Sequence, residues 1–204
     1  MNKLMILAAW LVLIAGGSAA EEAVGIRIVD AARQQIGVTT NYDPSYTKLK
    51  YPGGDVPLGT GVCSDVVVRA LRRVGTDLQK EVHEDMEKNF AGYPQKWGLK
   101  APDKNIDHRR VPNLMHYFER HSIWLQEKTT QPYVWTYAPG DIVAWDLGSG
   151  VTHIGIVSDK RPVHTPWGDT PLIIHNIGSG TKEEDILFKY KVIGHYRFRP
   201  HAKD

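Results

Sequence analysis

The sequence predicts an α+β domain in which helices come first and an antiparallel β-sheet follows. Apolar residues recur at helical spacing in the first part of the chain. The last third instead contains short runs of β-branched and aromatic residues, separated by turn sequences rich in Gly, Pro and Asp. Helices followed by strands are typical of an α+β domain rather than of a parallel sheet with alternating helices.

The N-terminal residues have the pattern of a secretory signal peptide. Met1-Asn2-Lys3 is a short positive start, residues 4–17 are almost wholly apolar, and Ser18-Ala19-Ala20 places small residues before Glu21. The apolar run is shorter than the roughly 20 residues that cross a bilayer. We therefore expect cleavage after residue 20, one mature domain over residues 21–204, a periplasmic or secreted location, and no membrane span after cleavage.

Helix and strand signals follow one another in a clear order. Gly37 and Gly75 follow the first two predicted helices, and Pro112 lies in the first turn of the last one. The predicted helices cover residues 26–35, 62–74, 77–89 and 112–121, with long loops at 39–61 and 92–110. The predicted strands cover residues 142–145, 151–157, 172–176 and 193–198.

The charge balance argues against a polyanionic partner. Lys and Arg total 25 and Asp and Glu total 23, which gives a net charge of +2. A chain so close to neutrality lacks the basic excess that nucleic-acid binding requires. We expect a monomer with no nucleic-acid partner.

Cys63 is the only cysteine, so it cannot form an internal disulfide. In an oxidising compartment a lone thiol is either buried as a small core residue or used chemically, and composition leaves both interpretations open. Cys63 lies in the first turn of the helix predicted over residues 62–74. Unpaired N–H groups at a helix N-terminus favour a thiolate, so this position suits a nucleophile.

Two histidines lie in predicted strands among apolar neighbours, where an ionisable side chain needs a partner. If Val157 pairs opposite Pro171, then His153 lies opposite His175, with Cβ atoms about 4.5–5.5 Å apart. The alternatives are two hydrogen-bonded core histidines or a zinc site completed by a carboxylate. No His-x-His or His-Glu-x-x-His spacing supports zinc, so we expect no metal or cofactor. His195, in the last strand, is interpreted as a satisfied sheet residue.

Four short motifs follow one another along the chain. They are Gly61-Val62-Cys63-Ser64-Asp65-Val66-Val67, Pro139-Gly140-Asp141-Ile142-Val143, His153-Ile154-Gly155-Ile156-Val157 and Ile173-Ile174-His175. In this order they resemble the cysteine helix, the Pro-Gly-Asp strand, the base strand and the strand of the third catalytic residue of the NlpC-type papain-like cell-wall cysteine peptidases. Val62 and Asp65 depart from the usual Asp-Cys-Ser-Gly pattern. The chain also resembles a branch of exported bacterial domains of unassigned function.

The resemblance implies a papain-like fold with Cys63 at a helix N-terminus, packed on an antiparallel sheet that carries the histidines. It implies an exported hydrolase, a cysteine peptidase or amidase, that cleaves an amide bond in peptidoglycan or its peptide fragments. Cys63 would be the nucleophile, His153 the base and His175 the residue that orients the base. Two alternatives are an acyltransferase with the same Cys–His pair and a non-catalytic cell-envelope binding domain.

Further residues are candidates for supporting roles. The resemblance makes Asn176 the alternative third residue, and its place next to His175 means that only one of the two can point at His153. Tyr42 resembles a tyrosine that lies upstream of the cysteine in NlpC-type sites and would donate a hydrogen bond to the reaction intermediate.

Asp65, Arg109 and Arg110 are candidates for substrate binding. An arginine fork binds a carboxylate with two parallel hydrogen bonds, and peptidoglycan stem peptides carry free carboxylates. The alternative for the arginines is ordinary solvated charge. Asp65 would contact substrate or hydrogen-bond locally, and it would oppose thiolate formation if it lies near the sulfur.

Overall fold

The computed structural model describes residues 4–125, 136–162 and 170–199, and it confirms the α+β class. The helices within these residues are α1 (Leu4–Arg33), α2 (Cys63–Arg73), α3 (Leu78–Asn89) and α4 (Val111–His121), with short 3-10 turns η1 (Phe90–Gly92) and η2 (Asp107–Arg109). The strands are β1 (Asn41–Tyr42), β2 (Thr60–Gly61), β3 (Ile123–Trp124), β4 (Ile142–Asp146), β5 (Thr152–Val157), β6 (Ile173–Asn176), β7 (Thr181–Glu184) and β8 (Lys191–Arg197).

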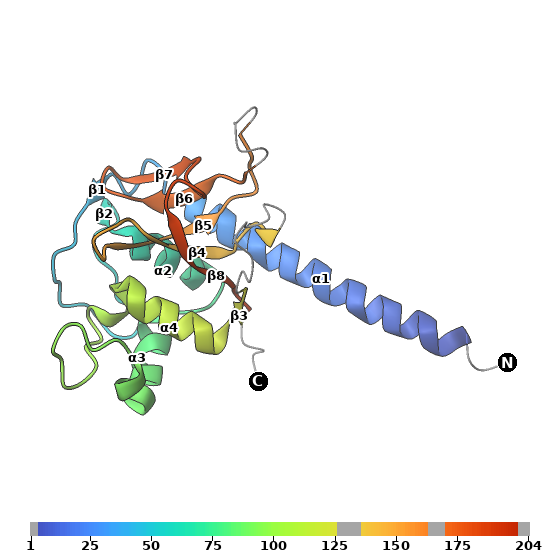
Figure 1. Cartoon of the computed structure of the whole chain (residues 1–204), viewed down its shortest axis with the longest axis horizontal. Helices are drawn as coiled ribbons and strands as arrows, with labels where there is room; N and C mark the ends of the chain where they lie inside the picture. Colours follow the sequence, from blue (N-terminus) through green and yellow to red (C-terminus); the bar gives the residue numbers. More distant parts are fainter. Residues whose placement is uncertain (1–3, 126–135, 163–169, 200–204) are drawn as a thin grey trace.

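Six strands form one sheet in the order β3-β8-β4-β5-β6-β7, and each described pair is antiparallel. Helices α1, α2 and α4 contact one face of this sheet, and the main apolar core lies between them (Figure 1). The opposite face carries a smaller apolar cluster, which includes Trp145, Val157 and Leu187. The sheet therefore has a helix-covered face and a second face under the segment 186–190.

Helix α1 begins far upstream of the predicted start at residue 26. It is continuous from Leu4, and its N-terminal part extends away from the rest of the chain (Figure 1). Its C-terminal part packs on the turn before β4, where a Cβ atom on Gly25 would lie 2.2 Å from the carbonyl oxygen of Pro139. No helix in the part of the chain that the structure describes has both the length and the apolar content needed to cross a membrane.

Strand β7 was not among the predicted strands. Its residues Thr181-Lys182-Glu183-Glu184 have no alternation of apolar and polar side chains, which is the signal that predicts a strand. It forms because its backbone pairs with β6, and it lies at the edge of the sheet. Charged side chains are common on edge strands because they discourage further pairing.

Candidate active site

Cys63 is the first residue of α2, and it lies against the sheet. The side chain of Asp65 accepts the peptide N–H of Val62 at 2.7 Å, which caps the start of this helix. Cys63 is 4% exposed, and the peptide N–H of Ile154 in β5 hydrogen-bonds to its sulfur. Because Ile154 directly follows His153, the helix start and the histidine strand meet at this point.

Burial raises the pKa of the Cys63 thiol to about 11, with a further contribution from the charge of Asp65. The peptide N–H groups of Ile154, Ser64 and Cys63 act in the opposite direction and are outweighed. The N–H groups at the helix start therefore lower the pKa of Cys63, as expected, but the effect of burial is larger in this conformation. The free energy lost by removing the thiolate from water is larger than the free energy gained from these N–H groups.

His153 and His175 lie on one face of the sheet, as predicted, but in a different register. Val157 pairs with Ile173 rather than with Pro171, so the residue opposite His175 is Gly155. A shift of two residues keeps every side chain on its face. The rings meet diagonally, with His153 Nε2 2.9 Å from His175 Nδ1.

Gly155 makes room for this diagonal contact. A Cβ atom at this position would lie 2.8 Å from Cγ2 of Ile173 and 3.1 Å from Cβ of His175. Any side chain at residue 155 would therefore push on His175 or on its strand.

Both histidines are almost completely buried, at 2% and 1% exposed. Burial lowers the pKa of His153 to about 3, and the neighbouring His175 adds to this effect. Burial also lowers the pKa of His175, against the raising effect of Glu184 and with a further lowering by Lys182 and Lys189. Both rings are consequently neutral near pH 7.

Glu184 was missed by the sequence analysis. Its Oε2 lies 3.1 Å from Nε2 of His175, so His153, His175 and Glu184 form a continuous chain of hydrogen bonds, which we call the relay. Glu184 pairs opposite Ile173 in the β6–β7 ladder, which puts it on the same face as His175. The acidic run after β6 was the available signal, but no strand was predicted there.

Asn176 points to the other face of the sheet and does not contact His153. Its side-chain amide donates to the carbonyl of Gly61 at 3.1 Å, and its oxygen accepts the N–H of Gly178 at 3.2 Å. The residue next to His153 is thus His175. Asn176 instead ties β6 to the strand that leads into Cys63.

Tyr42 is brought near Cys63 by the pairing of β1 with β2, in which it lies beside Gly61. Burial raises the pKa of Tyr42 to about 12, and the charges of Cys63 and Asp65 raise it further. The phenol is therefore protonated near pH 7 and remains a hydrogen-bond donor. The residue is 41% exposed, so it lies at the boundary between the site and solvent.

Asp65 and Arg109, the predicted substrate-binding residues, bind each other in this structure. Their side chains are 5% and 2% exposed and form a two-point ion pair, with both N···O distances at 2.9 Å. Arg109 also donates to the carbonyls of Asp43 and Ser45. This ion pair joins the start of α2 to the loop after Tyr42, and its donors are directed at the protein itself.

Arg110 is also held by the protein rather than free for a substrate. Its Nη1 donates to Asp107 at 2.8 Å, and its guanidinium lies over the ring of Trp97, 4.1 Å from the centroid. The side chain is 17% exposed. The guanidinium groups of Arg109 and Arg110 are thus both bound by carboxylates of the protein itself, Asp65 and Asp107.

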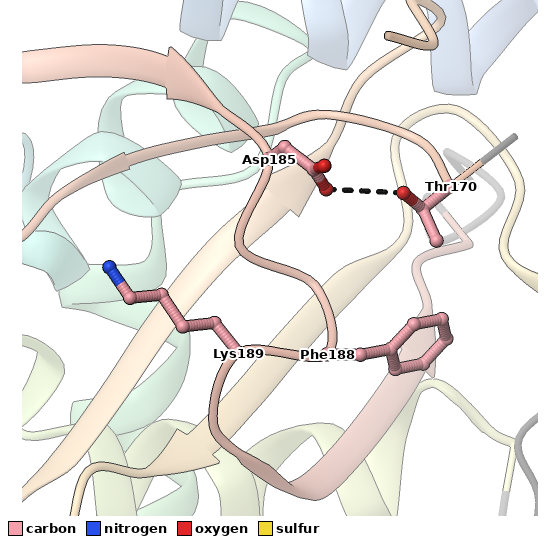
Figure 2. Close-up of a pocket in the computed structure, with 4 residues that line it drawn as sticks. All are labelled: Thr170, Asp185, Phe188 and Lys189. Carbon is pink, nitrogen blue, oxygen red and sulfur yellow. Dashed lines mark hydrogen bonds between the residues drawn. The ribbon is translucent and has the colours of Figure 1, made fainter. Parts of the chain in front are cut away.

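A pocket of about 400 Å³ lies near the relay and is lined by Thr170, Asp185, Phe188 and Lys189 (Figure 2). Asp185 accepts a hydrogen bond from the hydroxyl of Thr170 at 3.1 Å. Figure 2 shows Phe188 and Lys189 pointing to opposite sides of their segment. Asp185 directly follows Glu184, and the charge of Lys189 acts on His175, so the pocket adjoins the relay.

A zinc site finds no support in this geometry. Among the described residues, no group of three His, Cys, Asp or Glu side chains is arranged to hold a metal ion. His153, His175 and Glu184 bond to one another in series, whereas metal ligands converge on one point.

These features define an α+β protein with a buried cysteine at a helix N-terminus and a histidine–histidine–carboxylate chain on the adjoining sheet. Residues 29–198 match the model of a family described as "Domain of unknown function (DUF1287)", and the chain belongs to that family. It is also 58% identical over 173 residues, 85% of this chain and 81% of the relative, to "Uncharacterized protein YijF" of Escherichia coli (strain K12). No solved structure matches the chain.

Proposed function

We propose that this protein is an exported thiol hydrolase of papain-like, NlpC-type design that cleaves an amide bond in peptidoglycan or its peptide fragments. The observation that carries the proposal is the position of Cys63 at the start of α2 against Ile154 of β5, the strand whose preceding residue, His153, makes a 2.9 Å hydrogen bond with His175. The signal-peptide pattern and the four NlpC-like motifs support the location and the substrate. The enzyme would be either a stem-peptide endopeptidase or an amidase, since the same site suits both reactions.

The reaction begins with both members of the pair uncharged. His153 takes the thiol proton as the sulfur attacks the amide carbonyl carbon, so that ion formation accompanies attack rather than preceding it. His153 then gives this proton to the leaving nitrogen, the C–N bond breaks, and an acyl thioester remains on Cys63. Water, deprotonated by His153, releases the carboxylic acid and restores the thiol.

The oxyanion formed by this attack has donors close to the sulfur. The peptide N–H groups of Cys63, Ser64 and Ile154 already point at the sulfur, and the Tyr42 phenol is a protonated donor nearby. The Tyr42→Phe variant should therefore lower kcat more than it raises KM, because the phenol acts on the charge that develops in the transition state. An unchanged kcat would remove Tyr42 from the mechanism.

The proposed mechanism requires a hydrogen bond between Cys63 and His153 that this ligand-free structure does not contain. Among the described residues the ring of His153 bonds to His175 and does not bond to the sulfur of Cys63. Catalytic hydrogen bonds are often long in ligand-free enzymes and tighten in the substrate complex. The peptide N–H of Ile154, the residue after His153, faces the sulfur, so the proposal requires the ring of His153 to reach Cys63 when the substrate binds.

The test is cleavage of purified peptidoglycan fragments, followed by mass spectrometry. Wild-type protein should release a free amine and a free carboxylate at one bond, and Cys63→Ser and His153→Ala should release neither. His83→Gln is the matched control, because His83 is a histidine on α3 that pairs with Glu87 outside the site. Cleavage that persists in Cys63→Ser would reject the proposal.

Two alternatives predict different results in the same assay. An acyltransferase with this Cys–His pair would give more product when an amine acceptor is added. A non-catalytic binding domain is favoured by one observation, the raised thiol pKa, and it predicts no product with any fragment. In that case, alkylation of Cys63 should be slow and should not depend on His153.

A further inference from the structure

The carboxylate of Glu184 gives the histidine pair a direction. Glu184 Oε2 lies 3.1 Å from His175 Nε2, and His175 Nδ1 lies 2.9 Å from His153 Nε2. All three side chains come from neighbouring strands of one sheet face. The ring atoms in these two contacts leave Nδ1 of His153 outside the relay.

A neutral histidine carries one ring proton and one ring lone pair, whereas an ionised carboxylate can only accept. The contact with Glu184 therefore requires the proton of His175 to be on Nε2. The Nδ1 atom of His175 is then an acceptor, which requires the proton of His153 to be on Nε2. One carboxylate thus determines the proton positions on two rings, and the lone pair of His153 is left on Nδ1.

Among the residues that the structure describes, the other side chains near His175 offer no equivalent constraint. Lys182, the residue directly opposite His175, can only donate, and its side chain is exposed. Asp185 accepts from Thr170 instead, and Asn176 lies on the other face of the sheet. Without Glu184, the His153–His175 hydrogen bond can form in either direction, and one direction places the proton on the catalytic nitrogen.

We propose that Glu184 is a positioning residue that holds His153 in the tautomer with a free Nδ1 lone pair, the base for the Cys63 thiol. The proposal rests on the catalytic role of His153 proposed above. Glu184 does not contact the reacting atoms; it acts through His175. A base with its proton on the wrong nitrogen cannot accept one from the thiol, so the orientation of the relay controls the first step.

The direct test is long-range ¹H–¹⁵N NMR of the histidine rings in the full-length chain, which reports the tautomer of each ring without any turnover. The His153→Gln and His175→Gln variants assign the two signals. In the wild type we expect both rings to carry their proton on Nε2 between pH 6 and 8. A proton on Nδ1 of His153 would overturn the proposal.

The second measurement uses Glu184→Ala, with Glu87→Ala as the matched control. Glu87 is a carboxylate that pairs with a histidine, His83, on α3. In Glu184→Ala we expect a mixture of tautomers at His153 and His175, and a loss of about 10- to 100-fold in kcat. Glu184→Gln, whose amide oxygen can still accept from His175, should recover part of both. Wild-type tautomers in Glu184→Ala would overturn the proposal.

The two proposals fail in different ways. If the wild-type rings have the expected tautomers but no peptidoglycan fragment is cleaved, then the proposed hydrolase activity fails and the role of Glu184 in orienting the rings stands. If cleavage depends on Cys63 and His153 but the Glu184→Ala rings are unchanged, then the activity stands and Glu184 is not the positioning residue.

Discussion

Two histidine–carboxylate pairs lie on the same face of the sheet, and they differ in how their carboxylates are satisfied. His195 in β8 contacts Asp141 at 2.8 Å, and His175 in β6 contacts Glu184 at 3.1 Å. Asp141 also accepts from Arg197 at both oxygens and from the peptide N–H of Ala138. Its carboxylate is 1% exposed, whereas that of Glu184 is 41% exposed.

The difference separates a structural histidine from a candidate catalytic one. The Asp141 cluster is closed, because its charge is matched by Arg197 and the His195 ring stacks on Tyr137 with centroids 4.1 Å apart. It fastens the start of β4 to β8. The relay instead leads from Glu184 through two rings toward the strand position beside Cys63. A buried histidine is therefore a candidate for catalysis when its hydrogen bonds continue to another ionisable side chain, as those of His175 do.

The largest expected effect is the contrast between removing His153 and removing His195. His153→Ala should lower the hydrolysis rate by about 100-fold or more, because it removes the general base. His195→Ala should leave the rate per folded molecule near wild type but destabilise the fold by about 2–4 kcal/mol, from the lost hydrogen bond and the cavity. Kinetic assays beside urea unfolding of both variants check this. Equal losses of activity in His153→Ala and His195→Ala would show that the two histidines do not differ in role.

Asp65, two residues after Cys63, is a second buried carboxylate whose charge is matched by an arginine, Arg109. Arg109→Met leaves Asp65 buried without its ion-pair partner, which should cost about 3–5 kcal/mol of folding free energy. Asp65→Asn combined with Arg109→Met should cost less than the sum of the single changes, since no unpaired charge remains. Urea unfolding of the single and double variants measures this coupling. Additive costs would show that the pair is not coupled.

Acid should destabilise the fold through its buried histidines. The pKa of His153 is lowered to about 3 and that of His108 to about 4, both mainly by burial, so the unfolded chain binds protons that the folded chain does not. Stability is therefore full above about pH 6.5 and falls as the pH drops toward 4, by up to about 1.4 kcal/mol per pH unit for each such histidine. His108→Gln should reduce this slope in urea unfolding from pH 7 to 4. An unchanged slope would mean that His108 is accessible to protons in the folded state.

The smallest expected effect concerns the charge beside the relay. The ammonium of Lys189 lowers the pKa of His175, so Lys189→Met should raise that pKa and leave the His153–His175 hydrogen bond in place. An NMR titration of the ring measures the direction of the change. Lys88→Met, a change in the last turn of α3, is the control. A lowered pKa for His175 in Lys189→Met would contradict the assigned effect of the Lys189 charge.

Most helices and several members of the site could be predicted from sequence because their signals are local. Apolar spacing and a following glycine predicted the helix that begins at Cys63, and strand alternation put His153 and His175 on one face. The register was wrong by two residues, because the loop between β5 and β6 carries no local signal for pairing. Glu184 was missed since its strand is defined by its partner β6 rather than by its own residues.

The sequence by itself determined the order of helices and strands, the position of Cys63 at a helix start and the shared face of the two histidines. These follow from backbone periodicity, which acts over a few residues. Only the tertiary structure decided the protonation of the site and the partners of its charges. Burial raised the thiol pKa above its ordinary value, Asp65 reached Arg109 from 44 positions away, and Glu184 reached His175 across a strand pair. Desolvation and ion pairing depend on which distant segments exclude water, and no local pattern encodes that.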